Sequence, residues 1–216
     1  MHLKRQTISK LWPVPRKART TYVVKPNFSE DKGLPVLVVL RDILKVAANR
    51  KEVKQIIHEK NLLVNMHPVV DDKNSVVLFD TLTFVPTKKS FRLEFSKNGK
   101  FDLVEIKENE AGKKISKITN KKILRGKKIQ LNFGDGRNIL SNEKCLVNDS
   151  VILNLQNKKV EKILPMKEKA KVLVLEGKHT GETGVIEEIL SDKKMAKIKT
   201  SENNISVLIK QLIVIE

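Results

Sequence analysis

The stretch KVLVLEGKHTGETGVIEEI at residues 171–189 indicates how the C-terminal part of the chain folds. Apolar residues stand on both sides of a segment, 177–184, that contains three glycines. Alternating apolar residues predict β-strands, and the glycine-rich segment predicts the turn that joins them. Glycine adopts backbone angles closed to other residues and lets a second backbone approach closely. Lys178 and His179 lie at the predicted tip, where a phosphate chain could reach them.

This order of strand, spaced glycines and second strand resembles the KOW motif, a small β-barrel element of ribosomal and transcription proteins. The resemblance implies an SH3-like KOW β-barrel over residues 168–216, completed by strand-like runs at 195–199, 205–210 and 212–215. Taken alone, the stretch leaves open a surface hairpin that binds no ligand.

The charge of the chain points to a polyanionic partner. Its 216 residues include 43 lysines and arginines and 25 acidic residues, a formal net charge of +18. Such a surplus favours nucleic acid. An anionic membrane would also attract it, but the basic residues do not follow one face of an amphipathic helix. No apolar run reaches the roughly 18 residues that span a bilayer. We therefore expect no membrane partner.

The cysteine and aromatic content of the chain excludes further kinds of site and modes of binding. Cys145 is the only cysteine, which excludes an internal disulfide and a cysteine-based zinc site. The N-terminus lacks the apolar core of a signal peptide, so we expect a cytoplasmic protein. Aromatic residues make up 4% of the chain, too few for base stacking to be the main mode of binding. The modes of nucleic-acid binding that remain are contact with phosphates and recognition of shape.

Residues 1–33 are expected to form a basic, extended arm. No Asp or Glu occurs before Glu30, and the prolines of WPVPRK at 12–17 favour extended chain. An extended basic arm gains order along nucleic acid because each phosphate contact releases counterions. A disordered tail is the alternative, and Trp12 either stacks on a base or anchors the arm to the protein's own body. The candidate RNA contacts of the arm are Lys4, Arg5, Lys10, Trp12, Arg16, Lys17, Arg19 and Lys25.

Two short helices are predicted next. Leucines recur at helical spacing between 37 and 47, and Pro35 suits the first turn of that helix. Asn49 is the predicted N-cap of a second helix, with Glu52 in the capping-box position. Its apolar stripe leaves a basic face exposed. The candidate phosphate contacts here are Arg41, Arg50, Lys51 and Lys54.

These helices, followed by strand-like segments at 63–70 and 76–85, resemble the alpha-L RNA-binding module. That module occurs in ribosomal proteins, pseudouridine synthases and tyrosyl-tRNA synthetases. The resemblance implies such a module over residues 34–87. A solvated charged face is the alternative for the second helix alone, and the KOW-like hairpin in the same chain favours RNA.

Residues 88–167 are predicted to form a central all-β domain. Apolar residues alternate on either side of Asn98-Gly99, a strong hairpin signal. The sequence GDGR at 134–137 predicts another turn, from which Arg137 is a candidate RNA contact. The remaining strand-like runs are 115–118, 129–133, 151–155 and 160–164.

The order of arm, helical module, β-domain and KOW barrel is similar to one family, the small-subunit ribosomal proteins numbered four in archaea and eukaryotes. The chain is shorter than eukaryotic members, which favours an archaeal source. The matching stretches are HLKR at 2–5, WPVPRK at 12–17, YVVKP at 22–26, LPVLVVLRDILKVA at 34–47, QLNFGDGRNIL at 130–140 and EGKHTGETGVIEEI at 176–189.

The family resemblance implies an α+β fold and a permanent structural role in the small ribosomal subunit, supporting translation. On that basis the protein binds small-subunit rRNA through phosphate and shape contacts, beside neighbouring ribosomal proteins, and takes no cofactor or small-molecule substrate. The arm would thread between RNA segments and the helical residues would grip phosphates at a junction. Arg137, Lys178 and His179 would contact RNA from β-turns.

Two segments depart from the family pattern. NFSEDKG at 27–33 replaces a Pro/Gly-rich, histidine-bearing loop, so this loop is not counted among the RNA contacts. Asn65-Met66-His67 lacks the glycine that the family usually has at the middle position. We therefore expect a differently shaped tip on the alpha-L module.

Enzyme classes find no support in the sequence. There is no Gly-rich phosphate loop with Lys-Ser/Thr and no nucleotide-binding βαβ unit. The histidines His2, His58, His67 and His179 are scattered, without metal-ligand spacing. We expect a protein that is not an enzyme. The alternative function is a KOW-containing RNA-binding factor that cycles on and off polymerase or ribosome.

Overall fold

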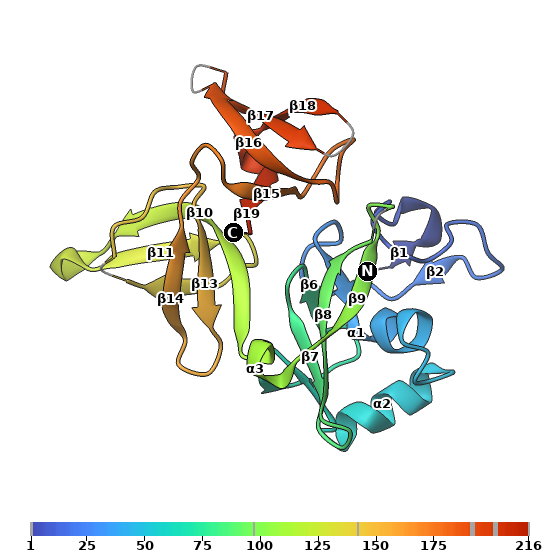
Figure 1. The fold of residues 1–216 in the computed structure, drawn as a ribbon. Helices are drawn as coiled ribbons and strands as arrows, with labels where there is room; N and C mark the ends of the chain where they lie inside the picture. The colour runs from blue at the N-terminus through green and yellow to red at the C-terminus, as the bar shows by residue number, and fades with distance from the viewer. Residues whose placement is uncertain (1, 97, 142, 191–192, 201–202, 216) are drawn as a thin grey trace. The chain divides into compact units, whose positions relative to one another are not determined.

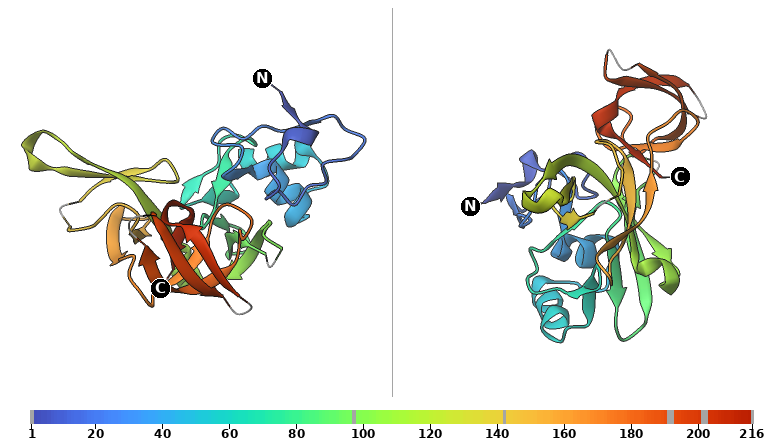
Figure 2. Two further views of the ribbon diagram at one scale, coloured as in Figure 1. Left: turned by 90° about the horizontal axis from the view of Figure 1, so that it is seen from above. Right: turned by 90° about the vertical axis from the view of Figure 1, so that its left-hand side faces the viewer.

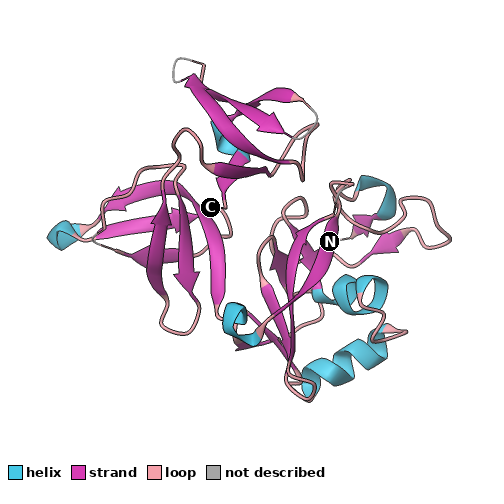
Figure 3. Cartoon of the chain, viewed as in Figure 1, coloured by secondary structure: helices cyan, strands magenta, loops and turns pink. Residues whose placement is uncertain are grey.

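The computed structural model describes residues 2–96, 98–141, 143–190, 193–200 and 203–215. The chain divides into two compact units, Met1–Gly112 and Lys113–Glu216, each of which is considered by itself. Both consist mainly of antiparallel strands, with a few short helices confined largely to the first unit (Figures 1 and 3). The fold is therefore α+β with β-structure predominating. Across the described residues, no helix has the length and apolar character needed to cross a membrane.

The N-terminal arm is folded rather than extended along its length. Strand β1 (Leu3–Lys4) pairs with β2 (Tyr22–Val23), so the chain between them forms a loop that begins with the 3-10 turn η1 (Arg5–Thr7). Leu3, Ile8 and Val14 are buried. These few apolar side chains are buried within unit 1, because they are too few to form a core of their own.

The two predicted helices are present, and the first is shorter than expected. Strand β3 (Gly33–Pro35), which pairs with β6 (Ser75–Val77), leads into α1 (Val36–Val38) and the π-helical segment η2 (Val39–Ile43). All residues from Leu34 to Leu40 are buried. Helix α2 (Arg50–His58) begins as predicted. The Asn49 side chain accepts hydrogen bonds from the backbone N–H of Lys51 and Glu52, at 3.1 and 3.3 Å.

A five-stranded sheet completes unit 1, in the order β5-β4-β7-β8-β9. Its strands are β4 (Leu62–Val64), β5 (His67–Pro68), β7 (Thr81–Phe84), β8 (Lys89–Phe95) and β9 (Phe101–Ile106), and helix α3 (Glu108–Ala111) follows.

The division after Gly112 differs from the expected boundary between residues 87 and 88. The segment 85–88 is exposed and contains Pro86, as a linker often does, but it is the turn of a hairpin in which β7 and β8 pair in register. The hairpin predicted around Asn98-Gly99 is confirmed: β8 and β9 pair over their length, and Gly99 has a positive φ of 66°.

The turn between β4 and β5 is strained at Met66. Val64 pairs with His67, and the two residues between them, Asn65 and Met66, both have positive φ, at 52° and 66°. This is the pattern of a type I′ hairpin turn, whose second central residue is usually glycine.

Met66→Gly should raise the free energy of unfolding by about 1 kcal/mol, because relief of the Cβ strain exceeds the added flexibility of the unfolded chain. Urea denaturation followed by circular dichroism measures the change. Met66→Ala is the control, since it removes the same side chain but keeps the strain. Equal stabilities of the two variants would refute strain at this turn.

The first sheet of unit 2 is antiparallel and runs in the order β12-β11-β10-β13-β14. The long strand β10 (Lys113–Ile123) lies at its centre. Its first part pairs with β13, and its second part pairs with β11. The 3-10 turn η3 (Arg125–Lys127) joins β10 to β11. The remaining strands are β11 (Ile129–Phe133), β12 (Asn138–Leu140), β13 (Ser150–Asn154) and β14 (Lys159–Leu164).

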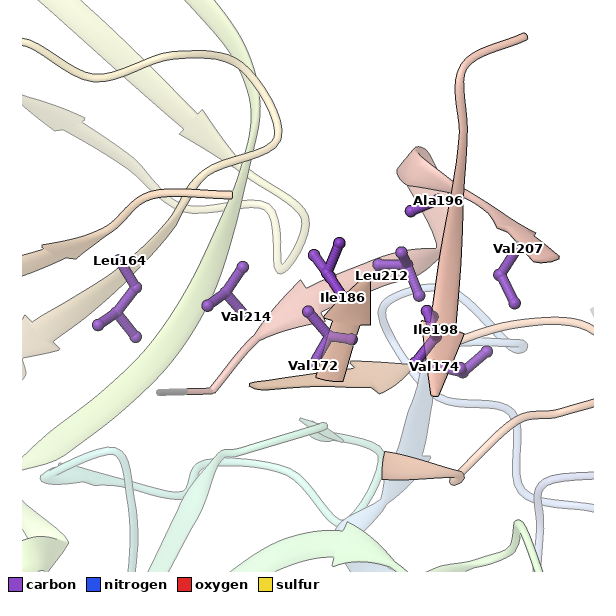
Figure 4. Packing of buried hydrophobic residues seen from close by; sticks show 9 residues of the cluster. All are labelled: Leu164, Val172, Val174, Ile186, Ala196, Ile198, Val207, Leu212 and Val214. Carbon is purple, nitrogen blue, oxygen red and sulfur yellow. The ribbon is translucent and has the colours of Figure 1, made fainter. Parts of the chain in front are cut away.

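The second sheet of unit 2 contains the stretch 171–189 and runs in the order β18-β17-β16-β15-β19. It curves around a core of aliphatic side chains, drawn as sticks in Figure 4, that includes Val172, Ile186 and Leu212. The predicted pair of strands and glycine turn is confirmed. Its elements are β15 (Lys171–Val174), β16 (Thr183–Leu190), β17 (Met195–Thr200), β18 (Asn204–Leu208), the 3-10 turn η4 (Ile209–Gln211) and β19 (Leu212–Val214).

The glycines of this turn serve the purposes expected of them. Gly177 and Gly181 have positive φ values of 105° and 90°. Gly184 pairs with Thr200 on β17, and a Cβ placed on it would lie 2.5 Å from a methyl carbon of Ile198 and 2.6 Å from the carbonyl oxygen of Lys199.

Gly184→Ala should lower the free energy of unfolding by about 1–3 kcal/mol, because the neighbouring strand must move to admit the methyl group. Thermal unfolding monitored by circular dichroism gives the size of the loss. Gly112→Ala is the control, since nothing lies within 4 Å of a Cβ at that position. A loss at Gly184 no larger than that at Gly112 would contradict the close approach of the two strands.

Buried polar contacts join the two sheets of unit 2. The Lys117 ammonium donates to the backbone carbonyls of Ile209, Lys210 and Leu212 at 2.7, 2.9 and 2.7 Å. The backbone N–H of Val214 donates to the Ser150 hydroxyl at 2.9 Å. Both side chains are buried. These contacts explain why the two sheets form a single compact unit.

Candidate nucleic-acid interface

Trp12 packs inside unit 1. Its side chain is 2% exposed, and its indole N–H donates to the carbonyl of Glu30 at 3.1 Å. Of the two roles that the sequence left open, the structure shows the anchoring role. A buried indole offers no ring face to a base, so Trp12 shapes the arm instead of stacking on RNA.

Two arginines of the arm hold its loop together. The Arg5 guanidinium donates to the carbonyls of Thr20 and Pro15, at 2.9 and 3.0 Å, and to the Thr20 hydroxyl. Arg16 donates to the carbonyl of Ile8 at 2.7 Å. Several of their N–H groups are therefore occupied within the arm. We infer that these two arginines act mainly by shaping the loop that carries the other cations.

The arm leaves a set of cations exposed. Lys25 forms an ion pair with Glu30 at 2.6 Å. The other four candidates make no side-chain hydrogen bond or ion pair with any residue that the structure describes, and all four are exposed. They are Lys4, Lys10, Lys17 and Arg19.

Arg50, at the start of α2, is paired with a buried carboxylate. Its Nε lies 2.6 Å from Oδ2 of Asp72, whose side chain is 1% exposed, while the Arg50 side chain is 47% exposed. Burial favours the neutral acid and acts to raise the pKa of Asp72. The hydrogen bond and charge of Arg50, together with the charge of Lys54, outweigh burial and hold that pKa below its ordinary value. Arg50 thus anchors α2 and still presents one side of its guanidinium to solvent.

Of the remaining helical candidates, one is paired with a neighbouring acid and two are exposed without a side-chain partner among the described residues. Arg41 forms a two-bond fork with the neighbouring Asp42, at 3.0 and 2.8 Å, which raises the pKa of the guanidinium. Lys51 and Lys54 are exposed on α2, and their side chains make no hydrogen bond or ion pair with a described residue. Helix α2 therefore presents two exposed lysines, whose side chains pair with no described acid, beside the half-exposed Arg50.

A buried amide and carboxylate support the β4–β5 turn, and neither was predicted as part of the site. Asn65 is 4% exposed, and its Nδ2 donates to Oδ1 of Asp80, itself 3% exposed, at 2.7 Å. The other carboxylate oxygen of Asp80 accepts from the backbone N–H of Val77 at 2.7 Å. In the sequence, an asparagine at a turn position was the only hint of this contact. Its partner Asp80 lies fifteen residues away, so local spacing does not reveal the pair.

In unit 2, Arg137 lies in a turn that a buried ion pair supports. Asp135 pairs with Lys114 at 2.5 Å, and their side chains are 5% and 2% exposed. Asp135 also accepts from the Ser116 hydroxyl and from the backbone N–H of Arg137. Burial acts to raise the pKa of Asp135, but Lys114 and these hydrogen bonds hold it below its ordinary value. The half-buried Arg137 is positioned by this network.

The glycine turn of the second sheet holds the last two candidates. Lys178 is exposed, and Nδ1 of His179 lies 2.9 Å from the Glu182 carboxylate. The structure thus places the arm and α2 candidates together in unit 1, and the turn candidates on separate sheets of unit 2. Among the residues that the structure describes, no group of three or more His, Cys, Asp or Glu could hold a metal ion.

Comparison with known proteins gives consistent relatives. Residues 87–160 match the model of the ribosomal family S4e. A small ribosomal subunit protein eS4 of Methanocella arvoryzae is 40% identical over 191 residues, which cover 87% of this chain and 80% of that protein. The protein of the same name in Nanoarchaeum equitans is 35% identical over 192 residues, covering 88% of this chain and 82% of the relative.

A solved structure shares the fold. The crystal structure of the 30S ribosomal protein S4e from Thermoplasma acidophilum matches with a TM-score of 0.74, covering 86% of this chain and 95% of that one, at 23% identity.

Proposed function

Since the chain belongs to the ribosomal protein family S4e, whose members are structural and not enzymatic, we propose that it is built into the small ribosomal subunit and binds the subunit's rRNA there. Its place would be the cytoplasmic ribosome, where it supports translation beside neighbouring small-subunit proteins. Its similarity to archaeal relatives agrees with an archaeal source.

One observation carries the RNA-binding part of this proposal. In unit 1, the arm and α2 present exposed cations whose side chains form no hydrogen bond or ion pair with a described residue: Lys4, Lys10, Lys17, Arg19, Lys51 and Lys54. Such cations gain most from phosphates, because binding releases the counterions condensed on RNA. Arg5, Arg16, Arg41, Arg50 and Lys25 would act at the edges of this surface, since part of their hydrogen-bonding capacity is used internally.

The module assignments belong to the same proposal. We assign α1, η2, α2 and strands β4 to β7 to an alpha-L-type module, and the second sheet of unit 2 to an SH3-like KOW barrel. Helix α2 with its exposed basic face and the glycine turn between β15 and β16 support these assignments. Lys178, His179 and Arg137 would then contact RNA from their turns.

A sucrose gradient of native lysate tests the function. The protein should remain with the small-subunit peak at constant stoichiometry after a wash in about 0.5 M salt, which screens exposed charge contacts heavily. Release into the top fractions, or migration with RNA polymerase, would replace the structural role by that of a factor that cycles on and off its partner.

A further inference from the structure

Unit 2 contains an acid-free, basic stretch comparable to that of the arm. Residues 111–134 include eight lysines and arginines and no Asp or Glu. Several of these cations are used internally: Lys113 pairs with Glu161, and Lys121 donates to the carbonyl of Cys145. Three cations toward the far end of the β10–β11 hairpin, Lys122, Arg125 and Lys128, form no such contact with a described residue.

These end cations lie on a ribbon that projects from its sheet. The far part of β10, with η3 and β11, extends away from β13 and β14 in both Figure 1 and Figure 2. Lys122, Arg125 and Lys128 are exposed and make no side-chain hydrogen bond or ion pair with the residues that the structure describes. Like charges on an exposed ribbon repel one another, so the protein alone gains nothing from this arrangement.

The strand register adds polar side chains beside these cations. Asn120, Asn132 and Asn138 lie directly opposite one another on β10, β11 and β12. Lys122, Gln130 and Leu140 form the next row on the same face, because residues two apart on a strand point the same way. We call these two rows the amide face.

The alternation of burial shows that the amide face is the outer one. The residues between the rows, Leu131 and Ile139, turn to the other side, where they pack in a core with Phe133 and Val151. The amide-face residues are exposed or half-exposed. Gln130 donates to Asn132 along the strand at 2.8 Å, which holds two of the amides in place.

We infer that the amide face and the three end cations form a second RNA-binding surface, which takes the ribose–phosphate backbone of structured small-subunit rRNA. Carboxamides donate and accept hydrogen bonds, as 2′-hydroxyls do. The wide, shallow minor groove of an RNA helix is accessible to side chains on an exposed sheet face, and the end cations match the flanking phosphates. This inference rests on the proposed function and extends it to unit 2.

The test measures binding of the full-length protein to transcribed small-subunit rRNA over a range of salt concentrations. The cation variant is Lys122→Ala with Arg125→Ala and Lys128→Ala. It should bind at least about tenfold more weakly, with a log–log salt slope reduced by about 2. The matched control is Lys158→Ala with Lys159→Ala and Lys162→Ala, which removes the same charge from exposed positions of the β13–β14 hairpin.

A second pair of variants tests the amides without a change of charge. Asn120→Ala with Asn138→Ala should weaken binding about fivefold and leave the salt slope unchanged, because neutral hydrogen bonds are lost. Asn157→Ala with Asn203→Ala, also at exposed positions, should bind as the parent does.

The outcomes separate this inference from the function on which it rests. Failure of the parent protein to bind rRNA would remove the proposed function. Normal parent binding with unaffected cation and amide variants would overturn only the second surface. An equal loss in the cation variant and its control would mean that net charge alone matters. A defect seen in whole subunits and not with rRNA would assign the surface to a protein neighbour.

Discussion

Lys114→Met should lower the free energy of unfolding by about 3 kcal/mol, because it removes the ammonium that contacts the buried Asp135 carboxylate and leaves only the half-buried Arg137 guanidinium, 4.0 Å away, as a cation. Removing one partner of a buried ion pair costs more than removing both. The remaining donors to Asp135, the Ser116 hydroxyl and the backbone N–H of Arg137, are neutral. Urea unfolding at neutral pH, with tertiary structure as the signal, measures the loss.

The double variant Lys114→Met with Asp135→Asn is the control, since its neutral amide can accept through its oxygen from the backbone N–H of Arg137 and donate through its NH2 group to the Ser116 hydroxyl. It should recover most of the stability. A double variant as unstable as Lys114→Met would show that packing of the lysine chain, and not charge, accounts for the loss.

The effect should also depend on pH. In the parent protein the pKa of Asp135 lies below its ordinary value of 3.8, so the contribution of this pair is fully present above that value and is lost as pH falls through the lower folded-state pKa. In Lys114→Met, burial dominates and the carboxyl takes up a proton at higher pH. The difference in stability between the parent and Lys114→Met should therefore shrink from pH 7 toward pH 3.

Replacement of Lys10, Lys17, Arg19, Lys51 and Lys54 by alanine should weaken binding to small-subunit rRNA at least about a hundredfold near 0.1 M salt. The slope of log K against log salt should fall by about 4, since each lost phosphate contact removes roughly 0.7–0.9. None of these side chains is buried or hydrogen-bonded to a described residue, so the fold should persist. Titration of labelled rRNA at several salt concentrations gives both quantities.

A variant with Lys144, Lys158, Lys159, Lys162 and Lys167 of unit 2 changed to alanine serves as the charge control. These lysines are also exposed, but none belongs to a proposed contact surface. The control should lose much less affinity. Equal losses would mean that RNA senses the net charge of the protein and not the surface formed by the arm and α2.

Local signals predicted much of the fold. Asn49 with Glu52 marked the start of α2, and the spaced glycines marked the β15–β16 turn, because caps and turns depend on residues only a few positions apart. The grouping of strands was harder to predict. The exposed, proline-containing β7–β8 turn resembles a linker in sequence, and only the pairing of the strands on either side shows that it belongs to a hairpin.

In the candidate site, too, local features could be predicted and contacts between distant residues could not. Composition and spacing predicted where cations gather, and the structure shows which of them have partners. Arg50 and Asp72 are 22 residues apart, and Arg5 reaches Thr20, so no short motif reveals these pairs. The amide face was missed because its rows form across three strands. It becomes visible only when the register is known.

The hydrogen bonds of Lys117 bear on when unit 2 folds during synthesis of the chain. Its carbonyl acceptors lie 92 to 95 positions further along the chain. While synthesis is still short of those positions, the ammonium on β10 lacks these three acceptors, and burying it without them is unfavourable. We therefore expect the face of β10 that carries Lys117 to stay open to solvent on the translating ribosome until residues 209–212 have emerged. Limited proteolysis of stalled nascent chains would reveal this as protection that begins abruptly beyond that length.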